Sequence, residues 1–87
     1  MSIISKVTEF LDYLEFKYHV YSNKIICIDR TSMVCFWNAN DEQDAYDLTL
    51  KEIRNLLKDD IKYVYWAGRT DDWMSIEFHK YVGGCNI

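Results

Sequence analysis

The sequence predicts one α+β domain over residues 1–87, in which two helices pack on one face of a largely antiparallel five-stranded sheet. Two observations lead to this fold class. Apolar residues recur at steps of three and four near the N-terminus and again past the middle of the chain, which is typical of helices with one buried face. Short runs rich in aromatic and β-branched residues occupy much of the rest, as expected of strands joined by turns. The predicted order is α-β-β-β-α-β-β, in two layers.

The first part of the chain is predicted to contain one helix and three strands. A helix over residues 3–16 follows from the apolar stripe, with Ser2 as its N-cap. Two segments behind it, 22–24 and 29–32, are rich in the polar residues that favour turns. The strands that these turns separate are expected at residues 18–21, 25–28 and 33–37.

The second part is predicted to contain a helix over residues 41–58 and two strands. Asn40 and Gln43 have the spacing of a capping box, and acidic residues crowd the first turn, where the helix dipole favours them. A hairpin loop is expected at residues 68–72, between strands at 62–67 and 73–82.

Alternation is clearest in the last predicted strand. Residues at every second position are apolar, and we expect this set to be buried against the helices: Met74, Ile76, Phe78 and Val82. The intervening residues should line an open face of the sheet: Trp73, Ser75, Glu77, His79 and Tyr81. One of Tyr63, Tyr65 or Trp66 is expected to join them. Exposed Tyr and Trp are enriched at binding hot spots, although aromatic side chains in a small domain can equally serve to cover a thin core.

The charge balance argues against several partner classes. The net charge is −4, and the ten basic residues are scattered singly along the chain. Binding to nucleic acid or to anionic membranes relies on clustered Lys and Arg, so neither a long nucleic acid nor a membrane is an expected partner. No segment reaches the ~18 consecutive apolar residues of a membrane-spanning helix.

Thiol and imidazole groups give no recognisable reactive site. Cys27, Cys35 and Cys85 are odd in number, and neither they nor His79 have the short spacings of a zinc site. Cys27 and Cys35 fall in predicted strands, where cysteine behaves as a small apolar residue. We therefore expect reduced thiols in a cytoplasmic protein, with no disulfide, metal or cofactor. No nucleophile elbow or phosphate-binding loop occurs, which favours a protein that is not an enzyme.

Paired carboxylates are the candidate binding residues. The acidic run at the start of the second helix is explained by capping and the helix dipole, whereas Asp59, Asp60, Asp71 and Asp72 fall in predicted loops that do not require them. Solvated turns would account for these pairs as well. Together with Trp73 and Tyr81 as aromatic anchors, they form the predicted binding set.

In its size, acidity, aromatic content and mixed helix–strand pattern, the chain resembles the small proteins that bacteriophages encode against host defence, such as anti-CRISPR inhibitors. The resemblance extends over the whole chain but rests on no motif, and no functional residue is carried over from it. It implies a stoichiometric inhibitor that docks on a host enzyme, for example a nuclease or a defence complex.

Two other functions fit the same sequence. The aromatic face could bind a small nucleotide-like ligand in an oligomer, since every base offers a flat surface for stacking. A minor enzyme or a subunit of a larger complex is the third hypothesis. A panel of nucleotides separates the first two, because a ligand that binds the native state raises the melting temperature.

Overall fold

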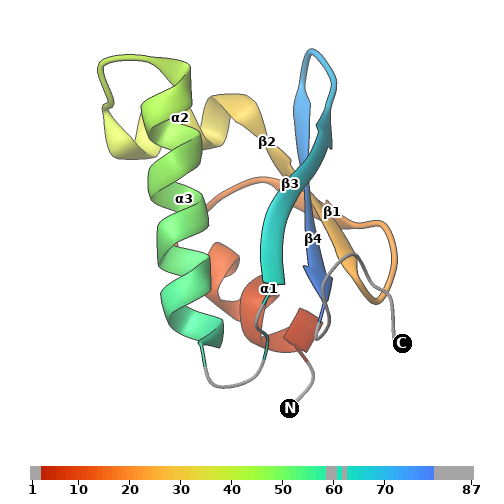
Figure 1. The fold of residues 1–87 in the computed structure, drawn as a ribbon. Coiled ribbons are helices and arrows are strands. Elements are labelled where there is room, and N and C mark those ends of the chain that lie inside the picture. Colours follow the sequence, from red (N-terminus) through yellow and green to blue (C-terminus); the bar gives the residue numbers. More distant parts are fainter. Residues whose placement is uncertain (1–2, 59–60, 62, 80–87) are drawn as a thin grey trace.

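The computed structural model describes residues 3–58, 61 and 63–79. Over these residues, three helices and four strands follow one another in the order α1-β1-β2-α2-α3-β3-β4 (Figure 1). Their bounds are Ile3–Tyr13 (α1), Tyr18–Val20 (β1), Ile25–Asp29 (β2), Arg30–Trp37 (α2), Glu42–Leu57 (α3), Tyr63–Arg69 (β3) and Trp73–His79 (β4).

The strands form an antiparallel sheet in the order β1-β2-β4-β3. The hairpin β3–β4 therefore inserts its second strand beside β2, and the register sets Ile26 opposite Ile76 and Asp29 opposite Trp73. A bulge between Trp66 and Gly68 shifts the pairing of β3 near the tip of that hairpin. Beyond the bulge, Gly68 lies opposite Ser75.

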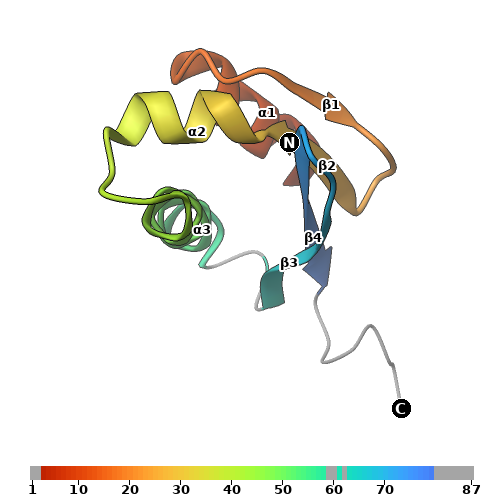
Figure 2. The same cartoon turned by 90° about the horizontal axis from the view of Figure 1, so that it is seen from above.

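The helices lie on one side of the sheet, and none of the three described helices covers the opposite face (Figure 2). Between the layers lies one continuous apolar cluster, to which all three helices and three of the strands contribute. Its buried members are Val7, Leu11, Phe16, Ile26, Ile28, Met33, Ala45, Tyr46, Ile53, Leu57, Ile61, Val64, Met74, Ile76 and Phe78. The predicted alternation is confirmed along β4, where Met74, Ile76 and Phe78 are buried and the residues between them are half-buried.

The predicted five-stranded sheet is wrong, because the segment expected to form the third strand belongs to α2. The sheet over the described residues has four strands, and the element order is α-β-β-α-α-β-β. Two end residues explain the helix. The Asp29 carboxylate accepts hydrogen bonds from both the amide and the hydroxyl of Ser32 at 2.9 Å, which caps the first turn. Asn38 closes the helix in the left-handed region at φ 48°.

Helix ends elsewhere follow the same chemistry. Helix α1 ends at Tyr13, three residues before the predicted end, because Glu15 adopts a positive φ of 62° and the amide of Phe16 donates to the carbonyl of Leu11. At α3, the N-cap is Asp41 rather than the predicted Asn40, since the Asp41 carboxylate accepts from the amide of Asp44 at 2.9 Å.

The outer edge of β3 carries a contact from α3. The amide of Phe78 donates to the carbonyl of Lys24, so Phe78 turns its peptide groups towards β2. Its register partner Val64 must then turn its own carbonyl away from β4. Arg54 of α3 donates to that carbonyl from Nε at 3.0 Å and from Nη2 at 2.8 Å.

Candidate binding site at the hairpin tip

The tip of the β3–β4 hairpin is a three-residue loop, Thr70, Asp71 and Asp72. The amide of Thr70 donates to the carbonyl of Trp73 at 2.8 Å, and the amide of Trp73 donates back to the Thr70 hydroxyl at 3.1 Å. These two bonds close a tight turn, so β3 ends at Arg69 and β4 begins at Trp73, only three loop residues later.

All three carbonyl groups of this loop accept hydrogen bonds from Arg30. Nη1 of Arg30 donates to the carbonyl oxygens of Thr70 at 3.0 Å and Asp71 at 2.8 Å. The backbone amide of Arg30 donates to the carbonyl oxygen of Asp72 at 2.9 Å. Because Arg30 is the first residue of α2, its amide has no acceptor within the helix and is free to bind the loop. The main chain of the tip is thereby held against the helical layer.

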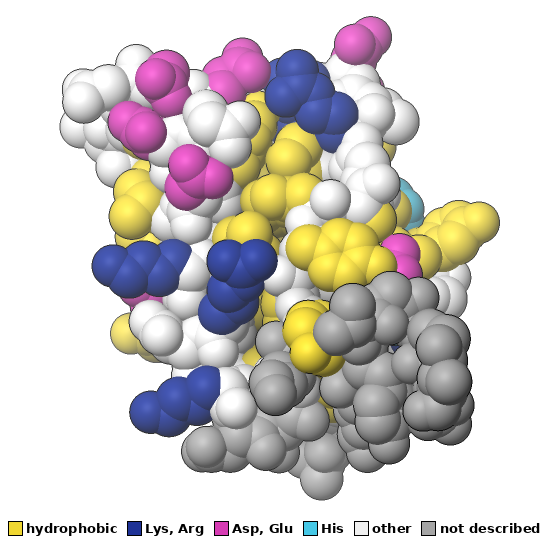
Figure 3. All heavy atoms as spheres, viewed as in Figure 1, with side chains coloured by type: hydrophobic (Ala, Val, Ile, Leu, Met, Phe, Trp, Pro, Cys, Tyr) yellow, Lys and Arg dark blue, Asp and Glu magenta, His cyan; other side chains and the backbone are white. Residues whose placement is uncertain are grey.

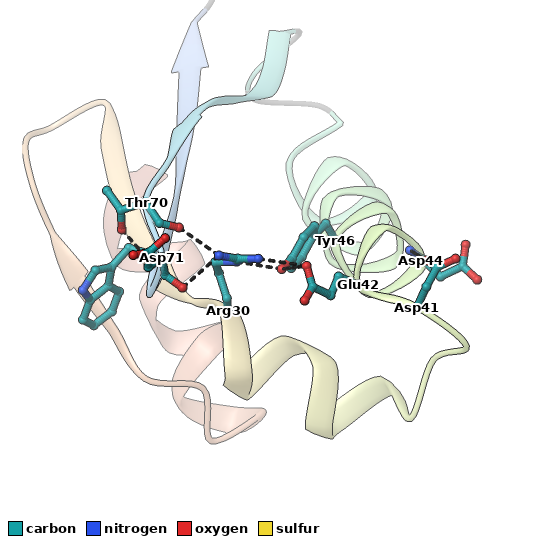
Figure 4. Close-up of polar contacts among 8 residues, drawn as sticks. Arg30, Asp41, Glu42, Asp44, Tyr46, Thr70 and Asp71 are labelled. Carbon is teal, nitrogen blue, oxygen red and sulfur yellow. Dashed lines mark hydrogen bonds and ion pairs between the residues drawn. The ribbon is translucent and has the colours of Figure 1, made fainter.

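The same guanidinium group reaches α3 on its other side. Nε donates to the hydroxyl of Tyr46 at 2.8 Å, and Nη2 forms an ion pair with the Glu42 carboxylate at 2.8 Å. Figure 4 shows the guanidinium lying between the hairpin tip and these two side chains of α3. The Arg30 side chain is only 17% exposed, whereas that of Glu42 is 61% exposed, so the ion pair lies at the surface and the bond to Tyr46 is the more buried of the two.

This arrangement gathers two acidic segments that are far apart in the sequence. Acidic side chains collect at one end of the molecule, over the start of α3 and at the hairpin tip, while Lys and Arg side chains lie further along α3 and also beside the tip (Figure 3). The acidic end comprises Asp41, Glu42, Asp44, Asp47, Asp71 and Asp72, all exposed. Among the described residues, only Glu42 of this set forms an ion pair. Arg30 and Arg69 lie at the same end, and the six carboxylates outnumber them, so the net charge here is negative.

Trp73 stands at the junction between the tip and the open face of the sheet. It is half-buried, and its ring meets the imidazole of His19 edge to face, with centroids 4.6 Å apart. In the next row, the Cys27 thiol lies 3.5 Å from the hydroxyl of Ser75. Beside this pair, the surface has a hollow of about 260 Å³. Its lining residues are Tyr21, Ile25, Cys27, Ala67, Gly68 and Ser75.

A polar cluster lies further along the same face. Glu77 accepts a hydrogen bond from the hydroxyl of Tyr65 at 3.1 Å, and the same carboxylate oxygen contacts Nε2 of His79. The rings of Tyr65 and His79 stack with centroids 5.8 Å apart. The hydrogen bond with His79 is the main cause that lowers the pKa of Glu77, and Tyr65 adds to it. Burial and the Glu77 hydrogen bond raise the pKa of Tyr65.

Of the predicted binding residues, the structure brings Asp71, Asp72 and Trp73 together at the tip. Asp59, Asp60 and Tyr81 lie outside the described residues. Tyr65 shares the open face, as its pairing with Glu77 requires, whereas Trp66 faces the helices and packs against Tyr46 with centroids 6.4 Å apart. Cys35, expected in a strand, lies exposed on α2, while Cys27 is buried in β2, and both are free thiols.

Sequence reasoning missed Arg30 and the link that it makes to Glu42. The acceptors of Arg30 at the hairpin tip are the main-chain carbonyl groups of residues 70–72. Every residue has such a carbonyl group, so the sequence does not indicate which ones Arg30 binds. The available signal was local: Arg30 directly follows Asp29, whose spacing to Ser32 is that of an N-cap.

No three His, Cys, Asp or Glu side chains among the described residues are placed to hold a metal ion. In the same part of the chain, every helix is too short or too polar to cross a bilayer. No family model, curated protein or solved structure matches the chain. The fold and the tip define a small α+β domain with an acidic end.

Proposed function

We propose that this protein works by binding another protein, with Trp73 as an apolar anchor and the carboxylates of the acidic end as steering charges. The observation that carries the proposal is the Arg30 contact with all three loop carbonyl groups. Because the main chain of the loop is held from within, the Asp71 and Asp72 side chains are left exposed beside Trp73. A site that is ordered before binding loses less entropy when a partner docks.

The charge of this end indicates the partner. Acidic groups speed encounter with a positively charged surface, and proteins that bind nucleic acid carry such surfaces. A stoichiometric inhibitor that covers the nucleic-acid-binding surface of a host enzyme would need an acidic end with a central aromatic anchor. We therefore propose a nuclease or another nucleic-acid-binding enzyme as the target.

The test uses the partner that co-purifies with the tagged protein from its native cell, identified by mass spectrometry. Surface plasmon resonance then compares variants at two salt concentrations. Replacing Trp73 by Ala should speed dissociation, with a loss on the order of 2 kcal/mol in binding free energy. Replacing Asp71 and Asp72 by Asn should slow association at low salt and weaken its salt dependence.

Matched controls come from α1 and the turn that follows it, away from the tip (Figure 1). Tyr13 is 83% exposed, so Tyr13→Ala removes an exposed aromatic ring, and a double Glu9→Gln, Glu15→Gln variant removes two exposed carboxylates. Both should bind like the wild type. If Trp73→Ala stays folded by circular dichroism and also binds like the wild type, the tip is not the interface.

A second candidate function is favoured by the hollow on the open face. Its volume of about 260 Å³ and the Tyr21 ring in its mainly apolar lining suit a small planar ligand. A rise in melting temperature with one member of a nucleotide panel, abolished by Ser75→Trp, would favour this function over protein binding.

A further inference from the structure

We infer that Arg30 is a positioning residue for the binding tip, an inference that rests on the proposed function. It contacts no partner in this scheme. It acts through the main chain of residues 70–72, whose three carbonyl groups it binds at 2.8–3.0 Å. Among the described residues, no other side chain donates to these carbonyl groups.

The geometry explains why an arginine is needed at this position. A guanidinium group offers five N–H donors in a fixed plane, so one side chain can bind acceptors on opposite sides at the same time. Here Nη1 serves the carbonyl groups of Thr70 and Asp71, while Nε and Nη2 serve Tyr46 and Glu42 of α3. A lysine ammonium is a single point with three donors and cannot span the loop and the helix together.

The position of Arg30 at the start of α2 adds a main-chain link between this helix and the hairpin tip. Its backbone amide, the first of α2, donates to the Asp72 carbonyl, so the start of a helix and the tip of a hairpin share one hydrogen bond. The buried apolar cluster contains neither Arg30 nor any residue of the tip, and Arg30 meets it at Tyr46, whose hydroxyl accepts from Nε. Loss of the guanidinium group should therefore loosen the tip and leave the core packed.

The first test needs no partner. Amide hydrogen exchange, followed residue by residue by NMR, is compared between wild type, Arg30→Lys and Arg30→Met. The reporters are the amides of Thr70 and Trp73, which close the turn, and the amide of residue 30, which binds Asp72. We expect exchange at these amides to rise on the order of tenfold in Arg30→Met and less in Arg30→Lys, with buried amides of α3 unchanged.

Two control variants separate the loop contacts from the others. Glu42→Gln removes the ion pair but leaves Arg30 its three loop acceptors, and Tyr46→Phe removes the hydroxyl acceptor on α3. Each should raise exchange at the tip by less than Arg30→Met does, because the three loop acceptors and one α3 partner of Arg30 remain. Wild-type exchange at the tip in a folded Arg30→Met variant would overturn the inference. If Arg30→Met does not fold, Arg30→Lys decides the question by the same measurement.

The second test uses the partner and the charge-conserving variant Arg30→Lys. A loosened tip occupies its binding conformation for only part of the time, and the apparent association rate equals the intrinsic rate multiplied by that fraction. We expect a loss on the order of fivefold, equal at both salt concentrations, whereas neutralising Asp71 and Asp72 gives a salt-dependent loss. A merely structural role for Arg30 would lower the melting temperature without changing association.

The two proposals can fail separately. If Trp73→Ala binds normally, docking through the tip is wrong, but the exchange data on the isolated protein still report whether Arg30 holds the tip. If Trp73→Ala weakens binding and Arg30→Lys changes neither exchange nor association, the site stands and the role of Arg30 is wrong.

Discussion

At the scale of single residues, Glu77 shows how neighbours on a sheet tune one carboxylate. Its contacts with His79 and Tyr65 favour the ionised form, which lowers its pKa in the folded protein. Lys24 acts on it in the same direction through its charge. A carboxylate with a depressed pKa contributes stability above its unfolded pKa, near 4.3, and this contribution is lost as the pH falls through the lower folded value.

Replacing Glu77 by Gln should therefore destabilise the protein in a pH-dependent way. The difference in melting temperature from wild type should be largest above about pH 5, where the carboxylate is ionised in both states, and should shrink towards pH 3. Thermal unfolding across this pH range is the measurement, with Glu9→Gln on α1 as the exposed control. A difference that stays constant with pH would contradict the assigned role of Glu77.

At the scale of elements, α2 shows where prediction from the sequence failed. Residues 33–37 read Met-Val-Cys-Phe-Trp, a composition that favours a strand. The end residues decide otherwise, since Asp29 caps the first turn and Asn38 terminates the helix in the left-handed region. The polar segment 29–32 was interpreted as a turn, although Asp and Ser three residues apart also suit a helix start.

The cap of α2 can be tested by itself. Asp29→Ala should lower the free energy of unfolding by about 1 kcal/mol, because the amide and hydroxyl of Ser32 lose their acceptor. Asp29→Asn should restore most of this loss, since Asn is an equally good N-cap. Urea unfolding followed by circular dichroism gives the values, and Thr31→Ala, an exposed neighbour, is the control. Equal stabilities of Asp29→Ala and wild type would show that the cap contributes nothing.

Helices α1 and α3 were easier to predict, because their signals are local. The periodicity of apolar residues located α1 and α3, and the strict alternation along β4 identified its buried face. The binding tip was predictable only in part. Asp71, Asp72 and Trp73 are adjacent in sequence, but their connection to Glu42 runs through Arg30 and depends on how β4 inserts beside β2.

At the scale of the whole molecule, one apolar cluster joins both layers. Met33 of α2 is fully buried in the same cluster as Ile53 of α3 and Ile76 of β4. Elements that share one core unfold together in small proteins, so α2 should not melt separately from the sheet.

Replacing Met33 by Ala should lower the free energy of unfolding by about 2–5 kcal/mol, the usual cost of a cavity at a buried methionine. Urea unfolding should give the same midpoint by far-ultraviolet circular dichroism and by tryptophan fluorescence, in wild type and in the variant. Phe36→Ala, which truncates a side chain that is 45% exposed, serves as the control. Two separated midpoints would show that α2 forms a unit of its own.

The Arg54 contact with the Val64 carbonyl has a consequence for assembly. A sheet with two open edges can recruit strands from other molecules at both ends, and such growth has no natural limit. Here the β3 edge is interrupted by the Arg54 side chain and by the bulge at Trp66 and Gly68. Among the described residues, no such contact interrupts β1 at the opposite edge. A molecule that adds strands through one edge only can form a closed pair but not a fibre.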